Sequence, residues 1–100
     1  MDFVKVCNLS DLAPGQCKTV EAGGKAIALF NVAGTILALD NTCLHNGGPL
    51  GEGMLEGDVV TCPWHMWEYN VRTGENLGNP ELKVASYAVQ VDGNDIKVAV

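Results

Sequence analysis

Short apolar runs with a period close to two recur along the chain and predict β-strands. They cover residues 3–7, 17–21, 26–32, 36–39, 59–61, 67–71, 87–91 and 96–100. The sequence Asp92-Gly93-Asn94-Asp95 between the last two runs is typical of a hairpin turn. One helical turn is expected at residues 8–12, and no helical periodicity is sustained anywhere. The pattern therefore predicts an all-β fold, an antiparallel β-sandwich or a small barrel.

Composition fits one folded domain over residues 1–100, since 47 % of the residues are hydrophobic and 18 % are charged. Twelve acidic against six basic residues give a net charge of −6, which argues against binding to nucleic acid or to an anionic membrane. Neither a membrane-spanning apolar stretch nor a signal peptide is visible. We therefore expect a cytoplasmic location, where cysteines serve as thiols or metal ligands rather than in disulfides.

Two segments interrupt the strand pattern, and they carry the unusual residues of the chain. One loop is expected at about 41–58, with five glycines, and the other at about 62–69. Long loops inside a small domain are usually functional or disordered. Because the chain's two histidines and two of its four cysteines fall in these loops, we favour a functional interpretation.

Each histidine closely follows a cysteine, in Cys43-Leu44-His45 and in Cys62-Pro63-Trp64-His65. Two thiols and two imidazoles are a metal-ligand set by type and number. A zinc ion in a zinc-stabilised interaction module is one alternative, although zinc sites usually take like ligands from one loop. A [2Fe–2S] cluster with mixed ligands accommodates one thiolate and one imidazole from each loop. The other two cysteines, Cys7 and Cys17, are interpreted as small half-buried strand residues.

The two loops, C-x-H and C-x₂-H, resemble the cluster-binding loops of Rieske proteins. The resemblance continues through Tyr69 and the turn at 72–74 to the final hairpin, and Gly78-Asn79-Pro80 resembles the proline loop that covers the cluster (about 78–80). It implies an antiparallel β-sandwich with a small cluster-binding subdomain of two loops. It also implies one [2Fe–2S] cluster per chain, held by the following four ligands: Cys43, His45, Cys62 and His65.

The function implied by the resemblance is that of a soluble one-electron carrier with no catalytic residues of its own. Such a ferredoxin takes an electron from a flavoprotein reductase and passes it to a terminal oxygenase that hydroxylates aromatic rings. An alternative within the same family is the small Rieske-like subunit of a nitrite reductase. The sequence predicts neither the oxygenase substrate nor the identity of the reductase.

Several positions depart from the family pattern and bear on the reduction potential. Gly48 and Trp64 stand where high-potential members carry a cysteine pair in a disulfide, and Trp67 stands where they place a serine. Tyr69 matches their tyrosine donor to a cysteine ligand. Fewer donors to the cluster sulfurs predict a potential in the lower half of the Rieske range of about −150 to +300 mV.

Backbone conformation is the second point of departure. Met66 follows His65 where the family usually has glycine, so a positive φ there would strain the chain. Gly47, Gly48, Gly51 and Gly53 are expected to let backbone amides approach the cluster sulfides.

Overall fold

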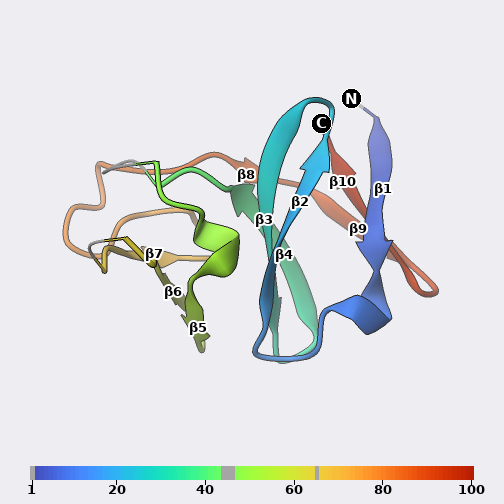
Figure 1. The fold of residues 1–100 in the computed structure, drawn as a ribbon, viewed down its shortest axis with the longest axis horizontal. Coiled ribbons are helices and arrows are strands. Elements are labelled where there is room, and N and C mark those ends of the chain that lie inside the picture. The colour runs from blue at the N-terminus through green and yellow to red at the C-terminus, as the bar shows by residue number, and fades with distance from the viewer. Residues whose placement is uncertain (1, 44–46, 65) are drawn as a thin grey trace.

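A computed structural model describes residues 2–43, 47–64 and 66–100, whose strands form three antiparallel sheets (Figure 1). The first sheet has the order β1 (Phe3–Asn8), β10 (Asp95–Ala99), β9 (Val89–Asp92). The second has the order β2 (Cys17–Ala22), β3 (Lys25–Val32), β4 (Thr35–Asp40), β8 (Ser86–Tyr87). The third has the order β5 (Met54–Glu56), β6 (Val59–Thr61), β7 (Glu68–Asn70). The short 3-10 helices η1 (Leu9–Asp11) and η2 (Leu50–Glu52) complete the elements.

The predicted fold class is confirmed, because the elements are antiparallel strands apart from the two short 3-10 helices. Within the described part of the chain, no helix has the length and apolar character needed to cross a membrane.

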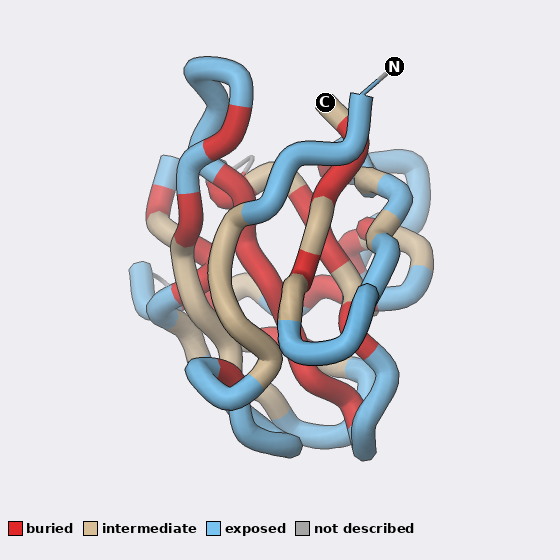
Figure 2. The backbone as a smooth tube through the Cα atoms, turned by 90° about the vertical axis from the view of Figure 1, so that its right-hand side faces the viewer, coloured by how far each residue is buried: buried red, intermediate tan, exposed pale blue. Residues whose placement is uncertain are grey.

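Strand β3 explains how a small chain supports two cores. Its residues 27–32 are all buried, and successive side chains of a strand point to opposite faces. Ile27 and Leu29 join a core between the first and second sheets, which we call the base core. Ala28 and Phe30 join a second core, the loop core, which contains residues of β6, β7 and the predicted ligand loops. The buried positions lie along interior strands, whereas most turns and much of β1 and β9 are exposed (Figure 2).

Two predicted segments differ from the structure. The run 87–91 divides at Ala88, because β8 pairs with β4 whereas β9 pairs with β10, so the chain changes sheets there. Residues 54–56, expected in a loop, form β5 through pairing with β6. The helical turn predicted at 8–12 is the 3-10 helix η1.

The loop that follows β4 is fixed to the second sheet by a buried amide. Asn41 is 7 % exposed, and its Oδ1 accepts hydrogen bonds from the Gly51 backbone N–H (2.7 Å) and the Thr19 hydroxyl (3.2 Å). The loop core and this side-chain bridge together hold the segment that contains Cys43 against the second sheet.

Candidate metal centre

The two predicted cysteine ligands each stand at the start of a closed loop. Cys43 comes just after β4, and its backbone N–H donates to the Gly48 carbonyl (2.9 Å) while its own carbonyl accepts from the Gly47 N–H (2.8 Å). Cys62 directly follows β6, and its N–H donates to the Trp67 carbonyl (2.7 Å). These bonds join the ends of both loops, so rigid strands set where each sulfur lies.

Both sulfurs lie inside the loop core, where Cys43 is 1 % and Cys62 0 % exposed. Burial raises the pKa of the Cys62 thiol, the Trp64 backbone opposes this shift, and a hydrogen bond with the Cys43 side chain raises the pKa further. The two thiols are therefore neighbours, and the Cys62 thiol resists ionisation by itself. A metal centre reverses this, because a coordinated thiol is deprotonated outright. The donor chemistry thus fits a positively charged metal group.

Tyr69 supplies a polar contact to this sulfur pair. It lies on β7, is 0 % exposed, and its hydroxyl is 3.3 Å from Cys43 Sγ. When Cys43 is a thiolate, only the phenol has a proton to give, so Tyr69 becomes the donor. This contact agrees with the role that the resemblance to Rieske proteins implies for Tyr69.

The Gly48 backbone closely approaches one of the cysteine sulfurs. A Cβ at this position would lie 2.8 Å from Cys62 Sγ and 3.2 Å from Trp64 Cβ. The structure thus places Gly48 against Trp64. These are the two positions at which high-potential members of the family carry a pair of cysteines. With glycine and tryptophan there, the two ligand loops touch without a covalent link.

Two other glycines of the first ligand loop pack closely against neighbouring strands. A Cβ on Gly51 would collide with Thr19, and one on Gly53 with the Thr61 carbonyl. These glycines therefore allow close packing of the loop on β2 and β6. An approach of their amides to the cluster sulfides stays a prediction. The sequence shows that glycines are needed but not which neighbour requires them.

The remaining predicted features divide between described and undescribed residues. His45 and His65, the predicted imidazole ligands, lie outside the described residues. In the described part of the chain, no group of three or more metal-ligating side chains is found. The predicted strain at Met66 is present, because its φ is +62°.

The predicted covering loop lies beside β7. The Leu77 N–H donates to the Glu68 carbonyl (3.0 Å), and the Asn76 side chain accepts from the N–H groups of Gly78 (2.8 Å) and Asn79 (3.0 Å). The sequence does not indicate that Asn76 and Asn41 anchor loops, because no sequence pattern separates a buried asparagine from an exposed one.

The other two cysteines behave as expected for half-buried strand residues. Cys7 packs at the edge of the base core, and Cys17 packs at the edge of the loop core. Cys17 Sγ also donates to the Gly53 carbonyl (3.1 Å). Burial raises the pKa of both thiols, so they stay protonated, and none of the four cysteines is in a disulfide.

Comparison with known proteins defines the class. The profile of the Rieske [2Fe-2S] domain matches residues 2–88, so the chain belongs to the Rieske family and its cofactor is a [2Fe–2S] cluster. The chain is 37 % identical over 99 residues to the ferredoxin component of biphenyl 2,3-dioxygenase from Rhodococcus jostii (strain RHA1). That match covers 98 % of this chain and 92 % of the relative.

Two solved structures refine the comparison. One is a complex of reduced oxygenase and oxidized ferredoxin in carbazole 1,9a-dioxygenase, with 34 % identity, a TM-score of 0.87 and coverage of 97 % of this chain and 92 % of the matched chain. The other is named for the small subunit of an NADH-dependent nitrite reductase from Mycobacterium tuberculosis, with 23 % identity, a TM-score of 0.90 and coverage of 99 % and 95 %. The second likeness shows the fold alone.

Proposed function

We propose that this chain is the one-electron carrier of a ring-hydroxylating dioxygenase system, and that it accepts electrons from a flavoprotein reductase and delivers them to a terminal oxygenase. The 37 % identical relative is a ferredoxin component of such a system, and a 34 % identical structure contains ferredoxin together with its oxygenase. The nitrite reductase alternative has weaker support, since its likeness is at 23 % identity.

The observation that carries the proposal is the pair of neighbouring buried thiols at the starts of two closed loops. We propose that Cys43, His45, Cys62 and His65 hold the cluster, within a single Rieske domain over residues 1–100. The ligand loops are about 41–58 and 62–69, and the loop at about 78–80 covers the cluster. When bound, the cluster supplies a site that gains and loses one electron. We also propose a cytoplasmic location, supported by four cysteines that are thiols or proposed cluster ligands and are not paired in disulfides.

The ligand set determines the charge that an added electron meets. Two ferric ions and two sulfides sum to +2, the two thiolates contribute −2, and the two neutral imidazoles contribute nothing. The oxidised site is therefore neutral, whereas four thiolates would leave it at −2. A neutral site accepts an electron more readily, which agrees with the higher potentials of histidine-ligated clusters. Tyr69 adds to this effect by donating to Cys43.

Two measurements test the proposal. First, the purified chain should contain about two irons and two acid-labile sulfides per chain and show a paramagnetic signal after one-electron reduction. Cys43→Ser and Cys62→Ser should lose this signal, whereas Cys17→Ser, the matched control, should keep it. A colourless protein with one zinc would contradict the cluster assignment.

Second, the chain should support substrate oxidation when it is mixed with the reductase and terminal oxygenase of the Rhodococcus jostii biphenyl system or of the carbazole and naphthalene systems. Oxidation should depend on the amount of chain added. Failure with all three systems, or stable co-purification with a nitrite reductase catalytic subunit, would contradict the role in a dioxygenase system.

A further inference from the structure

Met66 holds a backbone conformation that its residue type disfavours. Among residues 2–43, 47–64 and 66–100, Met66 (φ +62°) and Ala33 (φ +51°) are the non-glycine residues with a positive φ. A side chain with a Cβ is strained there, whereas glycine is not. The Met66 side chain is also 65 % exposed, so burial within its own fold does little to offset the strain. Another source of stabilising free energy is needed to explain a methionine at this position.

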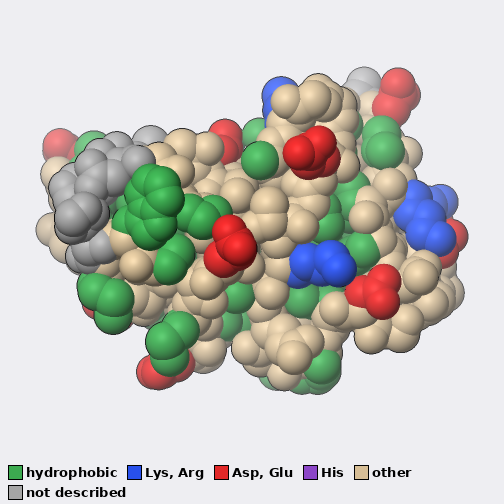
Figure 3. Space-filling view, in the orientation of Figure 1, with side chains coloured by type: hydrophobic (Ala, Val, Ile, Leu, Met, Phe, Trp, Pro, Cys, Tyr) green, Lys and Arg blue, Asp and Glu red, His purple; other side chains and the backbone are tan. Residues whose placement is uncertain are grey.

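Other exposed apolar side chains indicate that a contact with a partner supplies this stabilisation. Trp64, in the same loop, is 50 % exposed. Hydrophobic side chains gather at the end of the molecule that carries β5, β6 and β7 (Figure 3). Eight large hydrophobic residues are exposed in the described part of the chain. Five of them fall within residues 54–82, namely Met54, Trp64, Met66, Leu77 and Leu82. Exposed apolar groups that gather in this way mark interaction sites.

The stretches of chain around the four predicted ligands lack charged side chains. Residues 41–51 and 59–67 contain no Asp, Glu, Lys or Arg, although 18 % of the whole chain is charged. At that fraction, these twenty residues would carry between three and four charges. A partner that contacts these two stretches meets no charged side chain there, although four exposed acidic residues lie elsewhere in the loops: Glu52, Glu56, Asp58 and Glu68. Such a surface fits an apolar patch better than a basic one.

We infer that Met66 is a contact residue for the terminal oxygenase, and that its strained backbone is retained because the side chain becomes buried against that partner. The inference rests on the proposed function. Met66 directly follows His65, a predicted ligand, so a partner seated on Met66 also reaches the cluster end of the chain. A related ferredoxin of 34 % identity forms a complex with its oxygenase.

A matched pair of substitutions separates strain from contact. Met66→Gly relieves the positive φ and removes the side chain, whereas Ala33→Gly relieves the same kind of strain in the exposed β3–β4 turn. Strand β4, at about 3.3 Å per residue, separates that turn from the ligand loops by about 20 Å. Met66→Leu keeps both the strain and the apolar side chain.

The assay measures substrate oxidation by an oxygenase that the wild-type chain supports, at increasing chain concentrations. For Met66→Gly we expect KM for the chain to rise about tenfold, equivalent to about 1.4 kcal/mol, with kcat unchanged. Ala33→Gly and Met66→Leu should keep the wild-type KM. At a fixed scan rate, both glycine variants should raise the apparent Tm of the holoprotein by about 4 °C. Anaerobic reduction of each variant by the reductase should proceed at the wild-type rate.

Three results would overturn the inference. An unchanged KM for Met66→Gly would show that the oxygenase does not bury this side chain. A lowered Tm would show that Met66 packs within its own fold. Equal slowing of the reductase step would place the defect outside the oxygenase contact. Failure of the wild-type chain with every oxygenase tested would instead contradict the proposed function, so the two failures are distinguishable.

Discussion

Removing the Tyr69 hydroxyl tests how the protein tunes its electron affinity. Tyr69→Phe deletes the oxygen that lies 3.3 Å from Cys43 Sγ and leaves the buried ring in place. The packing of the loop core is therefore kept, and the main change is the loss of one hydrogen bond to a ligand sulfur. Because the added electron increases negative charge at that sulfur, the reduced state loses more stabilisation than the oxidised state.

The size of the shift follows from the strength of the bond. A hydrogen bond to a charged group contributes about 1.5–3 kcal/mol, and the part that differs between the two oxidation states is about 0.5–1.5 kcal/mol. For one electron, a tenfold change in equilibrium corresponds to about 59 mV, so the reduction potential of Tyr69→Phe should fall by about 20–65 mV.

Voltammetry of the holoprotein at neutral pH measures this shift directly. Tyr87→Phe is the matched control, because Tyr87 is the second of the chain's two tyrosines and lies on β8 in the second sheet. Its potential should equal that of the wild type. An unchanged or raised potential for Tyr69→Phe would refute the assigned direction of the hydrogen bond and its role in tuning.

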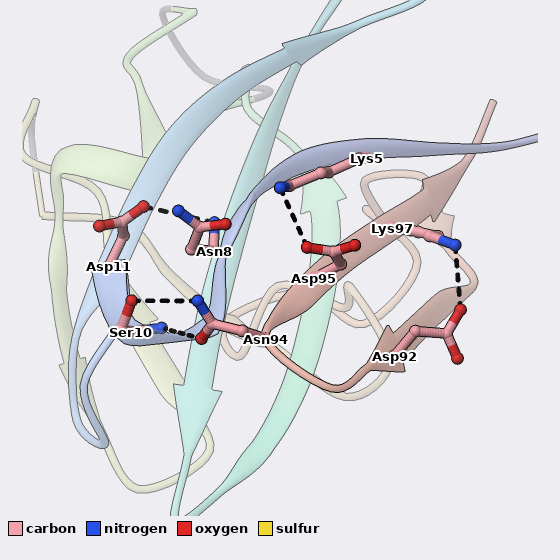
Figure 4. A network of polar contacts seen from close by, with 8 residues as sticks. All are labelled: Lys5, Asn8, Ser10, Asp11, Asp92, Asn94, Asp95 and Lys97. Atoms are coloured by element: carbon pink, nitrogen blue, oxygen red, sulfur yellow. Dashed lines mark hydrogen bonds and ion pairs between the residues drawn. The ribbon is translucent and has the colours of Figure 1, made fainter.

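Two further predictions concern packing and pH. Gly48→Ala should lower the iron and sulfide content per chain, because its Cβ would lie 2.8 Å from Cys62 Sγ. Gly93→Ala in the β9–β10 turn, whose Cβ would meet no heavy atom within 4 Å, should keep full content, and equal contents would contradict the close approach. Lys97 hydrogen-bonds Asp92 at 3.0 Å (Figure 4) and lowers the pKa of that carboxyl, so Lys97→Ala should raise it in a carbon-13 NMR titration. Since the folded pKa is the lowered one, the pair's small stabilisation is present above the unfolded pKa and is lost as pH falls through the folded value; an unmoved titration would refute the pairing.

Local patterns predicted most of the strands, because alternation and turn residues are local signals. The hairpin at 92–95 and the run 26–32 both appear in the structure, as the β9–β10 turn and as β3. The continuous apolar character of β3 reflects cores on both of its faces. Pairing partners depend on distant segments, so the sequence could not show that the chain changes sheets at Ala88 or that residues 54–56 pair with β6.

Those parts of the candidate site that depend on residue type and spacing could be predicted from the sequence. The sequence singled out the two cysteines, Met66 and Tyr69. In the structure the two thiols are neighbours, the Tyr69 hydroxyl lies beside Cys43 Sγ and Met66 has a positive φ, while ligation of the cluster stays a prediction. The sequence could not indicate the side-chain anchors Asn41 and Asn76, because their importance comes from burial in three dimensions.

The central claim is that two imidazoles and two thiolates hold one cluster. Its most direct test uses the chain's two histidines, which are the predicted nitrogen ligands. The holoprotein is prepared with nitrogen-15 in histidine alone, reduced by one electron and examined by pulsed electron paramagnetic resonance. Two nitrogen-15 couplings are predicted, with one lost in His45→Cys and the other in His65→Cys. A reduced signal without histidine nitrogen coupling would contradict mixed ligation by Cys43, His45, Cys62 and His65.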